Sequence, residues 1–383
     1  MSVTTPLGFD AAGIAAGIKS SGAPDLALIV NRGPSQAAAA VFTSNRAQAN
    51  PIIWSKEVIK DGTVSAIVLN SGGANCFTGS QGFQVTHRTA EAVAAALDVS
   101  AGDVLVCSTG LIGDQLNVEV LAAGVATAAA ALGADGGDDA ARAIMTTDSV
   151  PKTASISQDG WSIGGIAKGA GMLAPGLATM LVVITTDALL DAASLEAALR
   201  ASTRVTFDRL DSDGCMSTND QVSLLSSGAS GVTPDLTAFT AALTVLCREL
   251  ALKLQADAEG ASHNIAIEVV GALSEDEAVE VGRSVARNNL FKAAIFGNDP
   301  NWGRVLAAIG TTQAAFDPYN VDVSMNGVRV CHAGEPDQPR ELVDLSPRDT
   351  RVLIELHVGA ASATIFTNDL THDYVHENSA YSS

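Results

Sequence analysis

Aromatic and charged side chains are scarce in this sequence. Phe, Trp and Tyr make up 4% of the 383 residues, and Asp, Glu, Lys and Arg only 17%. Because 47% of the residues are hydrophobic, the composition argues against long disordered segments. The core must be built mainly from small and branched aliphatic side chains. The length predicts about two to three domains or one large α/β body.

Basic residues are also few. The chain has 22 Lys and Arg against 42 Asp and Glu, which gives a formal net charge of −20. A field of this sign repels the phosphates of nucleic acids and of anionic membrane surfaces. We therefore expect neither nucleic acid nor membrane as a partner. A small cationic substrate would suit the charge.

Metal-binding spacings are missing as well. The five cysteines form no CxxC pair, which is typical of a reduced intracellular chain. The six histidines form no HExxH motif. His372 and His376 are four residues apart, but we interpret Asp373–Val375 as a strand, which would hold the two imidazoles far apart. We therefore expect no metal site.

Targeting and membrane-spanning segments are not evident. The first residues, Met1–Pro6, are not a basic segment followed by an apolar one, so we expect no signal peptide. No apolar run reaches the roughly 20 residues that a membrane helix needs. These two observations predict a cytoplasmic protein.

Short apolar runs alternate with stretches of helical periodicity along the whole chain. We expect strands at 26–30, 39–43, 64–69, 104–107, 153–157, 161–166, 180–184, 222–225, 265–270, 321–325, 328–331, 352–357 and 363–367. We expect helices at 86–97, 116–132, 139–145, 194–201, 236–256, 275–288 and 305–309. A turn at Asn31–Pro34 separates the first two strands. The pattern predicts an α+β or mixed α/β fold with sheets covered by helices.

A loop of small residues at Lys168–Leu177 ends abruptly at Ala178-Thr179, and the apolar run Met180–Ile184 follows at once. Thr179 has two interpretations. It could be an ordinary residue that opens a strand. It could also be a nucleophile that becomes a new N-terminus when the chain cuts itself at the bond before it. The residues of this loop do not decide between them.

Several short blocks of sequence, spread over the chain, bear on the choice between the two interpretations of Thr179. They are Asn70–Gly79, Ser108–Gly113, Ala143–Asp148, Ala178–Leu181, Ser217–Asp220, Asp257–Gly260, Asp299–Arg304 and Glu377–Tyr381. Together they resemble the ornithine acetyltransferases, also called glutamate N-acetyltransferases, from about Gly8 to Ser383. The chain departs from the family at Gly73, Gly176-Leu177, Ala258 and Ser262-His263. None of these changes removes a proposed catalytic group.

The resemblance implies a fold and a processed form. The fold would be the αββα sandwich of N-terminal-nucleophile enzymes. Cleavage between Ala178 and Thr179 would give an α chain of residues 1–178 and a β chain of residues 179–383. The two halves would share one catalytic body and associate as a heterotetramer of two α and two β chains.

The resemblance also implies a reaction and its residues. Thr179 would take the acetyl group from N2-acetyl-ornithine and pass it to glutamate, as part of arginine biosynthesis and without a metal or organic cofactor. Thr109 and Gly110 would form the oxyanion hole. The remaining residues implied to bind substrate are Thr147, Lys168, Glu259, Asn378 and Ser383. We expect Lys168 to bind a carboxylate and Glu259 to hold the cationic amine of ornithine.

The chemistry of an N-terminal threonine supports this interpretation. A free α-amino group has a pKa of about 7.7, so part of it is an unprotonated base near neutral pH. One residue could then supply both nucleophile and base. Three alternatives stay open. They are an N-terminal-nucleophile amidohydrolase, a binding protein without catalysis, and a bifunctional enzyme that also uses acetyl-CoA to make N-acetylglutamate.

Overall fold

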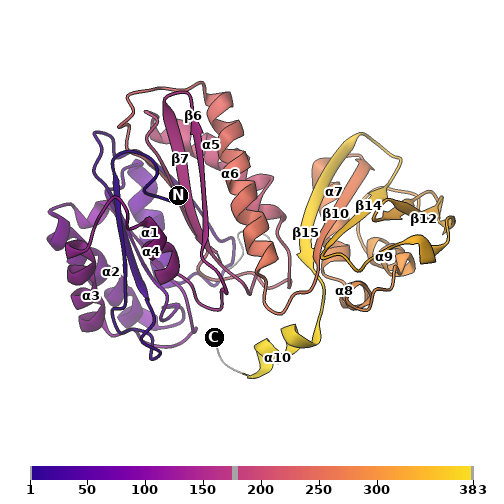
Figure 1. Cartoon of the computed structure of the whole chain (residues 1–383), viewed down its shortest axis with the longest axis horizontal. Helices are drawn as coiled ribbons and strands as arrows, with labels where there is room; N and C mark the ends of the chain where they lie inside the picture. Colours follow the sequence, from indigo (N-terminus) through magenta and orange to yellow (C-terminus); the bar gives the residue numbers. More distant parts are fainter. Residues whose placement is uncertain (1, 175–179, 381–383) are drawn as a thin grey trace.

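The computed structural model describes residues 2–174 and 180–380. These residues form two lobes (Figure 1). Residues up to about the end of the long helix α6 form the first lobe, which holds two sheets, and most of the remaining residues form the second lobe around a third sheet. None of the helices in the described ranges has the length and apolar character needed to span a bilayer.

The first sheet has the strand order β1-β2-β4-β5. Its strands are β1 (Phe9–Ile14), β2 (Leu26–Asn31), β4 (Ala66–Asn70) and β5 (Val104–Ser108). β4 and β5 run parallel, and the helix α2 (Gly79–Leu97) lies between them in the chain. Such a crossover is the usual connection of parallel neighbours, because a tight turn cannot join them.

The second sheet has the order β3-β9-β8-β7-β6. Its strands are β3 (Ala38–Phe42), β9 (Gln221–Ser226), β8 (Leu181–Thr186), β7 (Trp161–Lys168) and β6 (Lys152–Gln158). β7 and β8 pair antiparallel, with Lys168 opposite Leu181. Residues from both sides of the 178–179 bond therefore contribute strands to one sheet.

Both faces of the second sheet are buried. Val182 and Ile184 pack into a cluster with the helices α5 (Ala192–Arg204) and α6 (Leu236–Ala256). Leu181 and Val183 belong to a different cluster, which they share with first-sheet residues such as Ile67 and Leu69. Successive side chains of a strand point to opposite faces. The two sheets therefore stack directly on each other.

The outer face of the first sheet is covered in the same way. Leu28, Val68 and Val106 pack against α2 and α3 (Val118–Ala130). The layers thus run helix, sheet, sheet, helix, which confirms the predicted αββα sandwich and the mixed α/β class. The shorter helices α1 (Asn50–Val58) and α4 (Gly137–Ala143) contribute to the core between the sheets.

The second lobe is built on a six-stranded sheet with the order β13-β12-β11-β14-β10-β15. Its strands are β10 (Asn264–Ala272), β11 (Asp322–Met325), β12 (Val328–His332), β13 (Glu335–Pro336), β14 (Asp349–Glu355) and β15 (Ala361–Asn368). Its core includes side chains from α7 (Glu275–Ala286), α8 (Asn289–Phe296) and α9 (Trp302–Ile309). The last helix, α10 (His372–Ala380), extends from this lobe back toward the first one (Figure 1).

The strand predicted at Asp373–Val375 was wrong, because these residues lie in α10. Thr371 precedes the helix, and its hydroxyl accepts the N–H of Tyr374 at 2.9 Å. A threonine in this position stabilises a helix start, which outweighs the strand preference of Tyr and Val. His372 and His376 are thus one helical turn apart. The turn predicted after Asn31 leads from β2 to β3, which belong to different sheets.

Leu243→Ala tests the core beneath the second sheet. Leu243 is fully buried on α6, whereas Val245 on the same helix is 59% exposed. We expect Leu243→Ala to lower the free energy of unfolding by about 2–5 kcal/mol, because it leaves a cavity. Val245→Ala, the control, should change it by about 0.5 kcal/mol or less. Denaturant titration measures both, and equal losses would contradict the layer assignment.

Candidate active site

A cavity of about 280 Å³ lies where β5 and β7 end, and Asn378 of α10 also lines it. Six residues predicted from the sequence line it: Thr109, Gly110, Thr147, Lys168, Glu259 and Asn378. They come from five separate stretches of the chain. Ala178, Thr179 and Ser383, which complete the predicted set, lie outside the described residues.

Strand alternation brings Thr109 and Lys168 together. Leu105 and Cys107 of β5 face the second sheet, and Thr109 continues the same face two residues later. Ile166 of β7 faces the first sheet, and Lys168 likewise continues its face. The Nζ of Lys168 donates to the Thr109 hydroxyl at 3.1 Å. Two strands from different sheets thus deliver the hydroxyl and the ammonium to one point.

The Thr109-Gly110 turn is held by backbone contacts. The Thr109 N–H donates to Asn70 O, and the Thr109 carbonyl accepts the N–H of Gly73 at 2.9 Å. Gly110 has a φ of +127°, and a Cβ built there would lie 2.7 Å from the Gly73 nitrogen. Only glycine fits this close approach. The Asn219 side-chain amide ties the turn to β9 by donating to Ser108 O at 2.8 Å.

Lys168 is almost completely buried, and its environment is polar. Its Nζ also donates to the hydroxyl of Thr146 at 2.8 Å. Burial lowers the pKa of Lys168, while the nearby charge of Asp148 opposes this change. A buried ammonium with hydroxyl partners is well placed to bind an anionic group in the cavity.

Asp148 stands behind this lysine and orders the start of the glycine loop. One of its oxygens accepts the Gly169 N–H and the Lys152 ammonium, both at 2.6 Å. Burial alone would raise the pKa of Asp148, but Lys168, Lys152 and the Gly169 N–H together hold it below its usual range. Lys152 also contacts Asp257 at 2.6 Å. The four charges form a buried network of alternating sign.

Glu259 enters the cavity from the turn after α6. Its N–H donates to Ala170 O at 2.9 Å, and its carboxylate accepts the Asn378 side-chain amide at 3.0 Å. A Cβ on Gly171 would lie 2.7 Å from the Glu259 carboxylate, so this glycine makes room for it. A negative group therefore lines the same cavity as the Lys168 ammonium.

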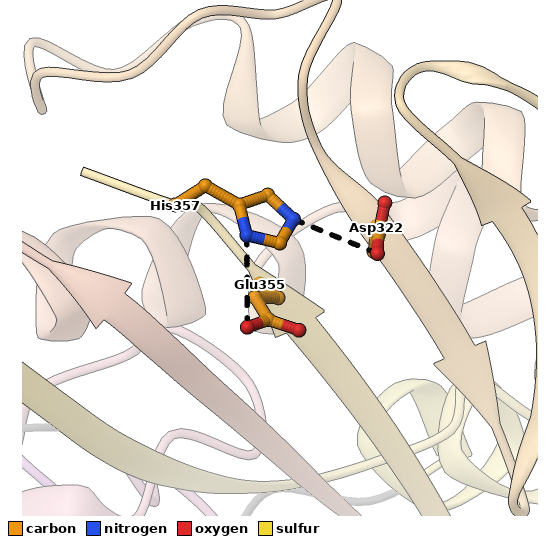
Figure 2. A group of neighbouring side chains, drawn as sticks. All are labelled: Asp322, Glu355 and His357. Atoms are coloured by element: carbon orange, nitrogen blue, oxygen red, sulfur yellow. Dashed lines mark ion pairs between the residues drawn. The ribbon is translucent and has the colours of Figure 1, made fainter. Parts of the chain in front are cut away.

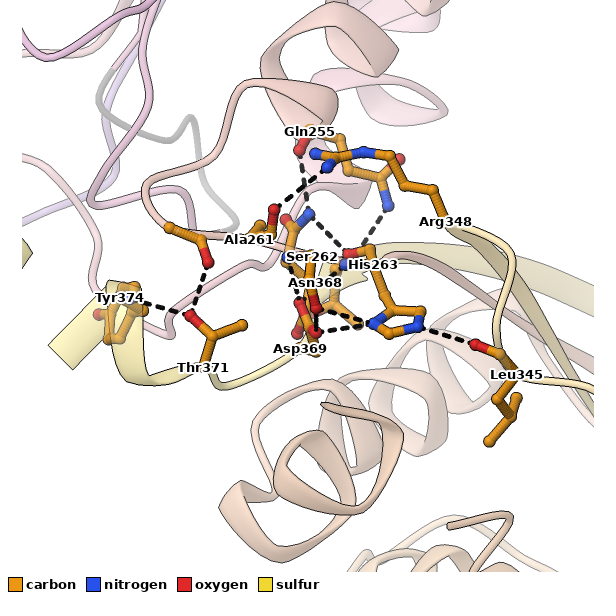
Figure 3. Close-up of polar contacts among 12 residues, drawn as sticks. Gln255, Ala261, Ser262, His263, Leu345, Arg348, Asn368, Asp369, Thr371 and Tyr374 are labelled. Atoms are coloured by element: carbon orange, nitrogen blue, oxygen red, sulfur yellow. Dashed lines mark hydrogen bonds and ion pairs between the residues drawn. The ribbon is translucent and has the colours of Figure 1, made fainter. Parts of the chain in front are cut away.

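A polar cluster fixes α10 and hence Asn378 (Figure 3). Asp369 accepts the backbone N–H groups of Ser262 and His263 and contacts His263 Nδ1 at 2.8 Å. The other ring nitrogen lies 2.9 Å from Leu345 O. The Thr371 hydroxyl donates to Gly260 O at 2.6 Å. The segment after α6, which carries Glu259, is thus bound to the start of α10.

A second group of titratable residues lies in the other lobe and on none of the elements that line the cavity. Asp322, Glu355 and His357 each place one atom that could bind a metal ion, a carboxylate oxygen or a ring nitrogen, within 4.8 Å of the other two (Figure 2). His332 Nδ1 lies 2.9 Å from Asp322, and Arg329 contacts the other oxygen of Asp322 at 3.7 Å. Positive and polar partners thus surround the Asp322 carboxylate, so ion pairing accounts for this cluster.

Sequence reasoning missed several residues that shape the cavity. Thr146 contacts Lys168, whereas the sequence predicts a role only for its neighbour Thr147. Asp148 and Asp220 lie in sequence blocks that carried the resemblance, yet neither received a role. A signal for the first was available, because Asp148 and Lys152 are four residues apart with opposite charge. The burial of Asp220 has no such signal, because it depends on contacts between distant segments.

Asp148→Asn tests the buried charge network. We expect a loss of about 3–5 kcal/mol in the free energy of unfolding at pH 7, because two buried ammonium groups lose a partner. A carboxyl with a lowered pKa in the folded state stabilises above its unfolded pKa near 3.9 and loses this effect as pH falls through the folded pKa. The difference between variant and parent should therefore shrink below about pH 4.

The control for this experiment is Asp139→Asn. Asp139 forms an exposed ion pair with Arg142 at 3.3 Å, so its loss should cost about 1 kcal/mol or less. Denaturant titration at pH 7 and near pH 3.5 measures both variants. A penalty for Asp148→Asn that is the same at both pH values would contradict the ionised state of Asp148.

Comparison with known proteins identifies the relatives of this chain. The model of the ArgJ family matches residues 10–383. The arginine biosynthesis bifunctional protein ArgJ of Streptomyces coelicolor is 62% identical over the full length of both chains. That of Mycobacterium leprae is 54% identical over 100% of this chain and 96% of its own.

Two solved structures are also similar in sequence to this chain. The ornithine acetyltransferase of Mycobacterium tuberculosis, crystallised with ornithine, is 54% identical over 47% of this chain and 96% of that chain, with a TM-score of 0.45. The ArgJ protein of Bacillus halodurans is 33% identical over 51% of this chain and 97% of that chain, with a TM-score of 0.49. The full-length matches confirm the resemblance predicted from the sequence: the chain belongs to the ArgJ family and is an enzyme of arginine biosynthesis.

Proposed function

We propose that this enzyme transfers the acetyl group of N2-acetyl-ornithine to glutamate through an acetyl ester on Thr179. The observation that carries this proposal is the shared cavity of Thr109, Gly110, Lys168 and Glu259. It combines hydrogen-bond donors for an oxyanion with one cationic and one anionic group. An N-acetylated diamino acid offers a complementary set of groups: a carbonyl, a carboxylate and an amine.

The cavity lies beside the chain segment that would carry the nucleophile. Met180, which follows Thr179 directly, is buried, and Leu181 pairs with Lys168 across the second sheet. Cleavage before Thr179 would leave this residue attached to β8 and free its α-amine. Small residues at 169–171 and 174 give the loop room to bend for attack on the Ala178 carbonyl.

The first half-reaction would release ornithine. The Thr179 hydroxyl oxygen bonds to the acetyl carbon, and its proton passes to the α-amine. Thr109 and the Gly110 N–H stabilise the oxyanion, and the C–N bond of the amide then breaks with the proton going to the leaving nitrogen. Lys168 would bind the carboxylate of the substrate. Glu259, held by Asn378, would bind its side-chain amine.

The second half-reaction would use the same groups. The amine of glutamate attacks the acetyl-threonine, which regenerates the hydroxyl and yields N-acetylglutamate. Exclusion of water decides between this transfer and simple hydrolysis. We propose that α10 and the C-terminal residues, including Ser383, close the cavity for this purpose. The contact of Asn378 with Glu259 supports the proposal.

We also propose a heterotetramer of two α and two β chains, and a cytoplasmic location. Two relatives of this chain are named bifunctional. This name favours a second activity, the synthesis of N-acetylglutamate from acetyl-CoA. An assay with acetyl-CoA and glutamate alone tests it. An amidohydrolase would instead release acetate from acetyl-ornithine whether or not glutamate is present.

Thr179→Ala tests the nucleophile. We expect the variant to stay uncut at 383 residues and to transfer no acetyl group, because it lacks the hydroxyl that self-cleavage and acetyl transfer both need. Denaturing mass analysis and production of N-acetylglutamate measure the two effects. Thr127→Ala, on an exposed part of α3, is the control and should be cut and active. Substantial activity of an intact parent chain would contradict the mechanism.

Gly110→Ala tests the oxyanion turn. An added Cβ would collide with Gly73 and displace the turn, so we expect the rate of acetyl transfer to fall about 100-fold or more. Gly113→Ala is a matched control. Gly113 has a similar positive φ of +95°, but a Cβ there meets nothing within 4 Å. Steady-state kinetics separate the collision from the backbone strain that the two variants share. Equal losses in both variants would assign the effect to strain alone.

A further inference from the structure

Asp220 is a buried carboxyl group beside the proposed reaction centre. It lies directly before β9, at the end of the Ser217–Asp220 segment whose first three residues line the cavity. Its side chain has no exposed surface. One of its oxygens accepts the N–H of Met180 at 3.1 Å. This nitrogen is the backbone N–H that comes next in the chain after the proposed nucleophile.

The surroundings of Asp220 disfavour a negative charge. No cationic group of the described residues forms an ion pair with it, and its second oxygen, Oδ2, has no hydrogen-bond partner among those residues. Burial raises the pKa of Asp220 well above its ordinary value, although the Met180 N–H, Ser217 and the more distant Lys168 act in the opposite direction. A protonated carboxyl group carries one O–H donor and keeps an acceptor oxygen.

A neutral acid at this place also suits the proposed chemistry. Acyl transfer develops negative charge on the substrate oxygen, and a carboxylate nearby in a buried site would oppose this charge. A neutral carboxyl group does not. It can accept the Met180 N–H with one oxygen while its O–H remains available as a donor.

We propose that Asp220 is a positioning residue which acts as an uncharged acid and fixes the peptide group between residues 179 and 180 during self-cleavage and acetyl transfer. This inference rests on Thr179 as the nucleophile. Asp220 takes no proton and forms no bond in either step. Its effect comes from holding the main chain of the nucleophile in one orientation.

Two substitutions at Asp220 separate this role from others. Asp220→Asn replaces the acid by a neutral group of the same shape, which also accepts through oxygen and donates through nitrogen. We expect it to cleave itself and to transfer acetyl groups within a few-fold of the parent. Asp220→Ala removes the acceptor for the Met180 N–H. We expect both rates to fall about tenfold or more.

The matched control is Asp211→Asn. Asp211 is also fully buried with one oxygen lacking a partner among the described residues, but it pairs with Arg287 at 2.8 Å and does not line the cavity. This variant should cleave and react like the parent. The appearance of fragments of 178 and 205 residues, followed over time by denaturing mass analysis, measures self-cleavage of the full chain.

The outcomes are distinct. Loss of function in Asp220→Asn equal to that in Asp220→Ala would show that a carboxylate is needed and would overturn the proposal. Parent-like rates in Asp220→Ala would also overturn it. Where Asp220→Ala fails to fold, as judged by thermal melting, the activity of Asp220→Asn still decides. A parent chain that is active without being cut would instead refute Thr179 as the nucleophile, whatever Asp220 does.

Discussion

The pairing of β7 with β8 is the contact on which the site depends. Six consecutive residue pairs, from Ile163 opposite Thr186 to Lys168 opposite Leu181, join the strands before and after the proposed cut. Both strands are buried on two faces, against the first sheet and against α5 and α6. A break in the loop between them would remove one covalent bond and none of these contacts. The sheet can therefore hold two chains in the arrangement in which one chain folded.

Electrostatics within the sandwich divides the buried groups into two kinds. Asp148, Lys152 and Asp257 are close enough to compensate one another, so ionisation is stabilised there despite burial. Asp220 has no such partner among the described residues, so its neutral form is favoured. Lys168 is close enough to feel the charge of both Asp148, in the compensated network, and Asp220. A cavity lined by one ammonium, one carboxylate and uncharged donors can bind a zwitterion without a large net field.

Most of the fold could be read from the sequence because it follows from local periodicity. The run at 180–184 indicated a buried strand, and the helix at 236–256 was predicted with the bounds that α6 has. The layer order came from family resemblance, since nothing in β2 or β3 alone indicates that the Asn31 turn leads from one sheet to the other. α10 was missed because the strand preference of Tyr374 and Val375 was given more weight than the local cap at Thr371, and because the anchor of Thr371 on Gly260 is a tertiary contact. Six site residues were named in advance because motifs carried them, whereas Asp220 and Thr146 became visible only through their contacts.

The anchoring of α10 sets the order in which the site can be completed. Glu259 receives its Asn378 partner from a helix within the last dozen residues of the chain, whereas both sheets of the sandwich are finished by residue 226. Domains fold from the N-terminal side during synthesis. The sandwich can thus form while the ribosome is still producing the second lobe. The cavity gains Asn378 only after the second lobe has been made, so its composition depends on a helix that follows both sheets in the chain.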